Sequence, residues 1–189
     1  MEAIVLSGPP ASGKTTVSNI LSRKLGMPVI GGSDILKEMA ADRGYKMSGE
    51  DWWDTPNAMK FVKERETNPD FDKETDRRLL KKIEEGNVIV TSYVAPWLSK
   101  YGFKVWLDGS PANRAKRMAE RDHKTADACA GVIKEREAKN TKIYKGIYNI
   151  EFGKDMSVFD LIIDTNKMGA EQVTEEILDK YDQKHAKKG

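Results

Sequence analysis

Short apolar runs recur along the chain, and longer stretches with helically spaced apolar positions separate them. Most of the runs are apolar at successive positions, which is typical of parallel strands buried on both faces. The pattern therefore predicts an α/β domain of three layers, a five-stranded parallel sheet with helices on both faces. The expected strands are Ala3–Leu6, Pro28–Ile30, Val88–Val90, Lys104–Leu107 and Leu161–Ile163.

Helical patterns fill the intervals between these runs. The first, Thr16–Leu25, places its apolar residues on one face, and further helices are expected at 35–41, 72–80, 111–121, 123–148 and 170–181. The pattern weakens over 45–70, which is expected to be a helical insertion. Its Trp52 and Trp53 are expected either to pack against the body of the protein or to offer a stacking face for a base. The polar tail at 184–189 is expected to be disordered.

A glycine-rich loop follows the first expected strand and opens the first helix. A tight turn alone accounts for Gly8 and Gly13, but the lysine and threonine that follow them are typical of a phosphate-binding P-loop. Lys14 is expected to reach the β- and γ-phosphates of ATP, and the Thr15 hydroxyl to contact Mg²⁺. The expected ATP-binding residues are Gly8, Pro9, Pro10, Ala11, Ser12, Gly13, Lys14, Thr15 and Thr16.

Ligands of such sheets bind at the carboxyl ends of the strands, so the residues directly after each strand are candidates for chemistry. Asp34 follows the second strand, where it fits either an N-cap or a carboxylate that holds a water on Mg²⁺, and one residue can serve both roles. Thr91, Ser92 and Tyr93 follow the third expected strand and are candidates for the same reason.

Two helical stretches carry further candidates. Asp72, Asp76 and Arg77 form either a solvated face or an acceptor pocket, with acids for sugar hydroxyls or base amines and arginine for phosphate. Three arginines at 114, 117 and 121 have the spacing of one helix face, which suits either an anion or surface ion pairs.

Composition narrows the function classes. The 189 residues include 32 Lys and Arg against 30 Asp and Glu, a balance that argues against a general nucleic-acid-binding protein. Cys129 is the only cysteine, so a reducing compartment is expected, and its expected role is a small residue on a helix. No signal peptide or membrane-spanning run is found in the sequence, so a cytoplasmic protein is expected. The expected oligomeric state is a monomer. His123 and His185 lack metal-ligand spacing and are expected at the surface.

Taken together, the sequence resembles the archaeal type of cytidylate kinase within the P-loop nucleoside monophosphate kinases. The resemblance is carried by GPPASGKTT at 8–16, GGSDILKEMA at 31–40, FDKETDRRLL at 71–80 and NVIVTSYVAPWL at 87–98. It continues through KVWLDGSPANRAKRMAERD at 104–122, IKEREAKNTKIYKGIYNI at 133–150 and SVFDLIIDTNKM at 157–168.

This resemblance implies phosphoryl transfer from MgATP to CMP or dCMP by a single domain spanning 1–189. The implied core sheet comprises 1–33, 86–113 and 158–183, with an acceptor-binding helical insert at about 34–85 and a lid at about 118–148. Lys14, Arg114, Arg117, Arg121 and Arg136 are the implied catalytic residues. The implied substrate-binding residues are Asp34, Asp72, Asp76, Arg77 and Tyr93, and Thr15 and Asp34, the latter through water, are the implied metal site.

The chain departs from the family pattern at two places. Tyr93 stands where the family has an arginine after the third strand, and Lys139 and Lys142 stand where it has further lid arginines. These departures keep two alternatives open. One is a P-loop kinase of the same fold with a different small-molecule acceptor, and the other is a non-catalytic ATP-binding protein.

Overall fold

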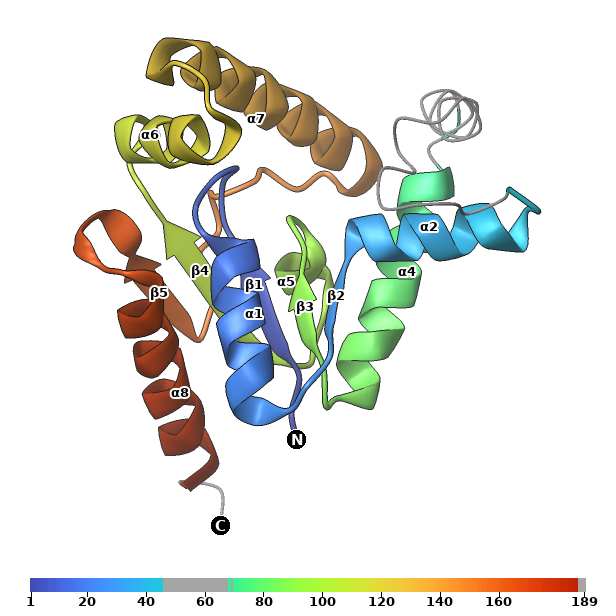
Figure 1. Cartoon of the computed structure of the whole chain (residues 1–189). Coiled ribbons are helices and arrows are strands. Elements are labelled where there is room, and N and C mark those ends of the chain that lie inside the picture. Colours follow the sequence, from blue (N-terminus) through green and yellow to red (C-terminus); the bar gives the residue numbers. More distant parts are fainter. Residues whose placement is uncertain (46–67, 69, 187–189) are drawn as a thin grey trace.

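The computed structural model describes residues 1–45, 68 and 70–186. Its sheet has five strands, all paired in parallel, in the order β2-β3-β1-β4-β5 (Figure 1). The strands are β1 (Ile4–Ser7), β2 (Val29–Gly31), β3 (Ile89–Thr91), β4 (Phe103–Asp108) and β5 (Leu161–Asp164). Each predicted strand is present, and each of its ends lies within one residue of the prediction.

Helices cover both faces of this sheet, which confirms the predicted three-layer architecture. On one face lie α1 (Lys14–Leu25) and α8 (Ala170–Ala186), which pack against each other. On the other face lie α4 (Asp70–Glu85) and the short α5 (Ala95–Leu98), and α2 (Gly32–Asp42) packs on α4 (Figure 1). A 3₁₀ helix of three residues, η2 (Thr165–Lys167), follows β5.

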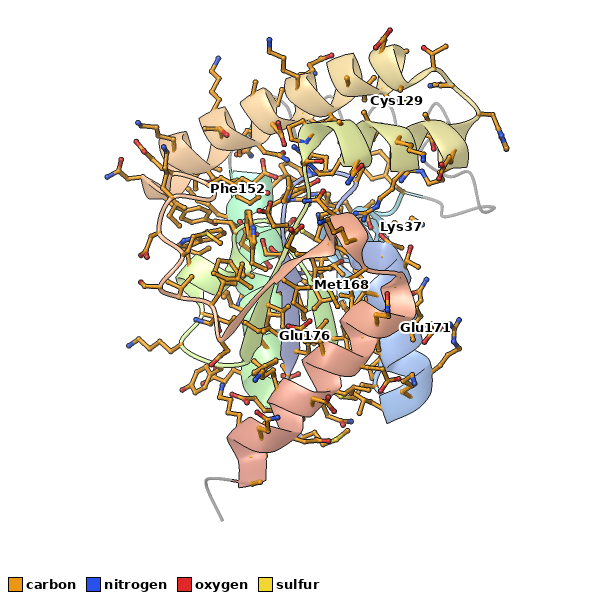
Figure 2. All side chains as sticks on the ribbon, turned by 90° about the vertical axis from the view of Figure 1, so that its left-hand side faces the viewer. Lys37, Cys129, Phe152, Met168, Glu171 and Glu176 are labelled. Carbon is orange, nitrogen blue, oxygen red and sulfur yellow. The ribbon has the colours of Figure 1, made fainter. Side chains whose placement is uncertain are left out.

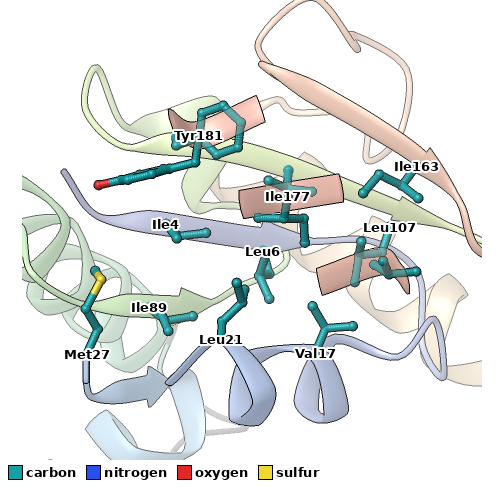
Figure 3. Close-up of a cluster of buried hydrophobic side chains, with 13 residues drawn as sticks. Ile4, Leu6, Val17, Leu21, Met27, Ile89, Leu107, Ile163, Ile177 and Tyr181 are labelled. Carbon is teal, nitrogen blue, oxygen red and sulfur yellow. The ribbon is translucent and has the colours of Figure 1, made fainter. Parts of the chain in front are cut away.

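Two hydrophobic clusters hold these layers together. Side chains alternate along a strand, so Ile4 and Leu6 of β1 pack under α1 and α8, whereas Val5 packs under α4. Figure 3 shows Ile4 and Leu6 between Leu21 of α1 and Ile177 of α8. Because β1 is central and buried on both sides, the residues that follow it are held firmly at the carboxyl edge of the sheet.

The helices α6 (Pro111–Asp122) and α7 (Ala126–Tyr148) form an antiparallel pair above the carboxyl ends of the strands (Figure 1). Side-chain caps begin both helices, because Ser110 accepts from the backbone of Asn113 and Thr125 accepts from that of Ala128. Cys129 is buried in the small apolar cluster between α6 and α7 (Figure 2), as expected for a small residue on a helix.

The chain's C-terminal region is more ordered than its polar composition predicts. The expectation of disorder from Lys184 onward is wrong up to Ala186, because α8 continues through these residues. Lys184 forms an ion pair with Asp160, and both Lys184 and His185 contact the carboxylate of Glu2. No helix within the described ranges is long and apolar enough to cross a membrane.

Candidate functional site

The loop between β1 and α1 approaches the end of β4 closely. Gly8 has a φ of 143°, and a Cβ added there would lie 2.3 Å from the carbonyl oxygen of Leu107. Gly13, the N-cap of α1, has a φ of 101°, and a Cβ added there would meet nothing within 4 Å. The loop is therefore pressed against the sheet at Gly8 and faces open space at the helix N-terminus, where anions bind favourably.

Replacing Gly8 with alanine is expected to lower the free energy of unfolding by about 2–4 kcal/mol. The added methyl group would strike backbone, and alanine rarely adopts this φ. Gly131→Ala is the matched control, because Gly131 lies in the interior of α7 with nothing within 4 Å of the new Cβ. Denaturant titration should show the control equal to the wild type or more stable by about 0.5–1 kcal/mol. Equal stability of the Gly8 variant and the wild type would contradict the close approach.

Lys14 begins α1 and turns back over the loop. Its Nζ donates to the carbonyl oxygens of Gly8 and Pro9, both at 2.8 Å, and lies 5.0 Å from the centre of the Tyr93 ring. The pKa of Lys14 is lowered to about 7, mainly because the ammonium group is buried. The positive charges of Arg136 and Arg114 nearby lower it further. The side chain is thus held where an added negative charge would be favourable.

A cavity of about 550 Å³ opens beside this lysine. Its walls come from the start of α1, the start of α2, one side of α4, the end of β3 and one face of α7. The lining residues are Lys14, Thr15, Gly31, Gly32, Ser33, Leu36, Asp72, Thr75, Asp76, Leu79, Thr91, Ser92, Tyr93, Arg136, Asn140 and Tyr144. This volume lies in the range of small-molecule binding sites.

Charges of opposite sign lie on different walls of the cavity. Lys14 and Arg136 supply cations from α1 and α7, and Asp72 and Asp76 supply carboxylates from α4. Asp76 is buried and accepts a hydrogen bond of 2.9 Å from the hydroxyl of Tyr148. Burial, together with the charge of Asp76, raises the pKa of Tyr148, so this hydroxyl remains a donor at neutral pH.

Tyr93 occupies the wall between the P-loop and α7. Its hydroxyl oxygen accepts from Nη2 of Arg136 at 3.4 Å, and its ring lies 6.5 Å from that of Tyr144 and 5.7 Å from that of Phe152, measured between ring centres. Phe152 belongs to the segment that leads from α7 to β5 (Figure 2). The aromatic side chains connect Tyr93 to α7 and to the segment after it.

Sequence reasoning missed two residues of this wall, Asn140 and Tyr144. With Arg136 they recur every fourth residue along α7, so they lie on one helix face. That spacing is a signal that the sequence contains. Trp52 and Trp53, the other aromatic candidates, lie outside the described residues.

Several of the expected site residues do not line the cavity, among them Arg77, Arg121 and Asp34. Arg77 binds Glu74 with two nitrogens and is 67% exposed, and Arg121 binds Asp122 and is 63% exposed. The prediction of Asp34 as the N-cap is wrong, because α2 begins two residues earlier and Gly31 is its N-cap. Asp34 is the third residue of the helix, and its carboxylate accepts from the backbone N–H of Gly31 at 2.8 Å.

The other two arginines of α6 bind backbone at the strand ends. Arg114 is 5% exposed, and it donates to the carbonyl oxygens of Gly109 and Pro10 and to the carboxylate of Glu137. Arg117 donates to both the hydroxyl and the carbonyl oxygen of Thr165. The regular spacing of the arginines therefore does not bring the three guanidinium groups to one anion in this structure.

Comparison with known proteins identifies a family. The sequence model of the cytidylate kinase-like family matches residues 3–167. A cytidylate kinase from Pyrobaculum islandicum is 33% identical over 168 residues, which are 88% of this chain and 85% of that protein.

Two solved structures share the fold at low sequence identity. An uncharacterized protein from Eubacterium ventriosum has a TM-score of 0.71 and 16% identity, covering 96% of this chain and 99% of its own. A gluconokinase from Sinorhizobium meliloti has a TM-score of 0.54 and 17% identity, and the match covers 96% of this chain and 91% of the gluconokinase. Because the family model matches 3–167 and a relative 33% identical covers 88% of this chain, the chain belongs to the cytidylate kinase-like family.

Proposed function

We propose that this protein transfers the γ-phosphoryl group of MgATP to CMP or dCMP, giving ADP and the corresponding diphosphate. The observation that carries the proposal is one cavity lined both by the P-loop residues Lys14 and Thr15 and by the carboxylates of α4. A donor phosphate on the P-loop would thus adjoin an acceptor in the cavity. Family membership favours a nucleoside monophosphate over the two alternatives, a different small acceptor or ATP binding without transfer.

The loop fits a nucleotide polyphosphate and its cation. Gly13 leaves open space at the N-terminus of α1, Lys14 supplies a cation there, and the Thr15 hydroxyl is a hard oxygen donor of the kind Mg²⁺ prefers. The Mg²⁺ ion would neutralise charge on the phosphate oxygens when bound. On nucleotide binding, Lys14 would release the two loop carbonyls and donate to phosphate oxygens instead. Asp34, whose carboxylate accepts from the backbone of Gly31, is the residue proposed to hold a metal-bound water.

The sorting of charges orients the acceptor. Its phosphate is attracted to Lys14 and Arg136 and repelled by Asp72 and Asp76. The two carboxylates accept hydrogen bonds, so they suit sugar hydroxyls or the exocyclic amine of cytosine. The acceptor therefore lies with its phosphate toward the P-loop and its nucleoside toward α4.

The transfer itself requires alignment and charge stabilisation more than proton removal. A phosphate oxygen of the acceptor is already ionised at neutral pH, so the chain needs no general base. Lys14 and Arg136 offset the charge on the transferring group, while α6 and α7, which contain most of the proposed lid at 118–148, exclude water from the cavity. The proposed acceptor-binding insert at 34–85 contributes α2 and α4.

A coupled assay of ADP release tests this function. The protein is incubated with MgATP and, separately, CMP, dCMP, UMP, AMP or GMP. Turnover should be greatest with CMP or dCMP, because the uracil of UMP offers no amine to a carboxylate and purines are larger. Binding of MgATP without turnover on any of the nucleotides would contradict the proposal.

Replacing Tyr93 with phenylalanine is expected to raise the Kd for CMP roughly 10- to 100-fold. This is the change in affinity that corresponds to the loss of one hydrogen bond to a charged group. The Tyr93 oxygen accepts from Arg136, which leaves its O–H free to donate to the acceptor's phosphate. Calorimetry with CMP and with cytidine separates the contribution of the phosphate from that of the nucleoside. Because cytidine lacks the phosphate, it should bind the wild type and the Tyr93 variant equally. Tyr101→Phe, at a ring that is 52% exposed, is the control. A parallel loss of cytidine binding would instead assign the hydroxyl to the nucleoside.

Binding of MgATP is expected to take up protons at pH 8 and almost none at pH 6. The lowered pKa of about 7 leaves Lys14 mostly neutral at pH 8 in the free protein, and neighbouring phosphates favour its charged form. At pH 6 the lysine is already charged, so binding adds no proton. Titration calorimetry in two buffers of different ionisation enthalpy measures this uptake, which should approach one proton. Equal uptake at the two pH values would contradict the lowered pKa.

A further inference from the structure

One buried guanidinium joins three segments of the chain. Nε of Arg114 donates to the carbonyl oxygen of Gly109 at 2.9 Å, and its Nη1 donates to the carbonyl oxygen of Pro10 at 3.2 Å. The same Nη1 donates to Oε1 of Glu137 at 2.7 Å. The turn after β4, the P-loop and α7 therefore meet at a single side chain that is 5% exposed.

Glu137 supplies the negative charge at this junction. A buried cation is costly without a partner, and removing one member of such a pair leaves the other uncompensated. Among the described residues, Glu137 is the carboxylate with an ion pair to Arg114. The pair is charge-assisted and short, so it restrains both helices more strongly than the exposed pairs of α7 do.

The position of Glu137 along α7 determines what this restraint controls. Successive residues of a helix are about 100° apart, so directing Glu137 at Arg114 also fixes the direction of its neighbour Arg136. Arg136 lines the cavity, as do Asn140 and Tyr144 on the same face of α7. Glu137 itself does not line the cavity.

We propose that Glu137 is a positioning residue for phosphoryl transfer: through Arg114 it holds α7 in the rotation that directs Arg136 into the cavity. The inference rests on the proposed function, because that function requires Arg136 to offset charge on the transferring phosphoryl group. It also explains why Arg114 is buried against the P-loop with its charge neutralised rather than free in the cavity.

The test uses Glu137→Gln, with Glu135→Gln as a matched control on the same helix. Glu135 pairs with Lys139 and is 65% exposed, so the control removes an ion pair without touching the junction. We expect Glu137→Gln to lower kcat roughly 10- to 100-fold, with a smaller change in KM. A loss of this size is expected when a group that acts on the reaction, here Arg136, is slightly misplaced. The control should keep the wild-type kcat. An unchanged kcat in Glu137→Gln would overturn the proposal.

A double-mutant cycle separates positioning from general destabilisation. In an Arg136→Ala background, adding Glu137→Gln should change kcat less than about twofold, because the group that it positions is gone. The same fold-loss in the presence and absence of the Arg136 side chain would show that Glu137 acts on structure generally, and would overturn the positioning role.

Hydrogen exchange of the α7 amides provides a readout that does not need turnover. Exchange should be faster in Glu137→Gln than in Glu135→Gln or the wild type, because α7 loses its connection to the P-loop. If the wild type shows no turnover on CMP, the proposed function fails, and exchange still decides whether Glu137 anchors α7. Unchanged exchange in Glu137→Gln would refute the anchoring itself.

Discussion

Replacing Lys14 with methionine is expected to lower kcat for CMP phosphorylation by about 10³-fold or more. The ammonium group lies at the junction of the P-loop and the cavity, where it touches two loop carbonyls and faces the Tyr93 ring. Methionine has nearly the same length but neither charge nor donors, so the loop is retained while the stabilisation of the transferring group is lost. Single-turnover measurement of ADP formation with saturating CMP reports this step directly.

Lys24→Met is the matched control for this experiment. Lys24 lies in the last turn of the same helix, exposed, and paired with Glu175. Its loss removes only a surface ion pair, so turnover should stay within about twofold of the wild type. A Lys14 variant that kept a tenth or more of wild-type activity would remove this lysine from the mechanism.

The second large effect is expected at Arg136, where substitution by alanine should lower kcat about 10³-fold, as for other arginines that act on transferring phosphoryl groups. Arg136 is the one arginine that lines the cavity among the residues the structure describes. Because the group acts on charge that develops during transfer, kcat should fall far more than the affinity for MgATP. Steady-state kinetics with both substrates varied measures the two effects separately.

Arg121→Ala provides the contrast. The sequence places Arg121 in the same set of candidate catalytic arginines, but its guanidinium is bound to Asp122 at the surface, away from the cavity lining. We therefore expect less than a twofold change in kcat. An equal loss in the two variants would mean that α6 and α7 rearrange before transfer and bring Arg121 to the phosphates.

The sheet and the phosphate loop were predictable because their signals are local. A fully apolar run such as Ile4–Leu6 has few alternatives to a buried strand, and glycine at positions 8 and 13 matches a backbone that other residues adopt only under strain. The local contact of Asp34 was predicted less accurately, since its carboxylate binds the backbone of the N-cap Gly31 from within α2 and is not itself at the N-cap.

The roles of the arginines were less accessible to sequence reasoning. Helical spacing groups Arg114 with Arg121, yet one is buried beside a carboxylate 23 positions away and the other pairs with the next residue. Arg77 also looked directed at the acceptor, but Glu74, one turn earlier, holds it outside the cavity. Long flexible side chains reach partners that periodicity does not specify.

The sequence by itself determined the parallel sheet, the phosphate loop and the family, because each depends on residue order within a short window or on similarity along the whole chain. Only the tertiary structure decided which charges line the cavity. Helical periodicity says which residues share a face, but the direction of that face depends on packing against other segments. In α7, Glu137 accepts from Arg114 of α6 and Tyr148 donates to Asp76 of α4, and both partners lie outside the helix.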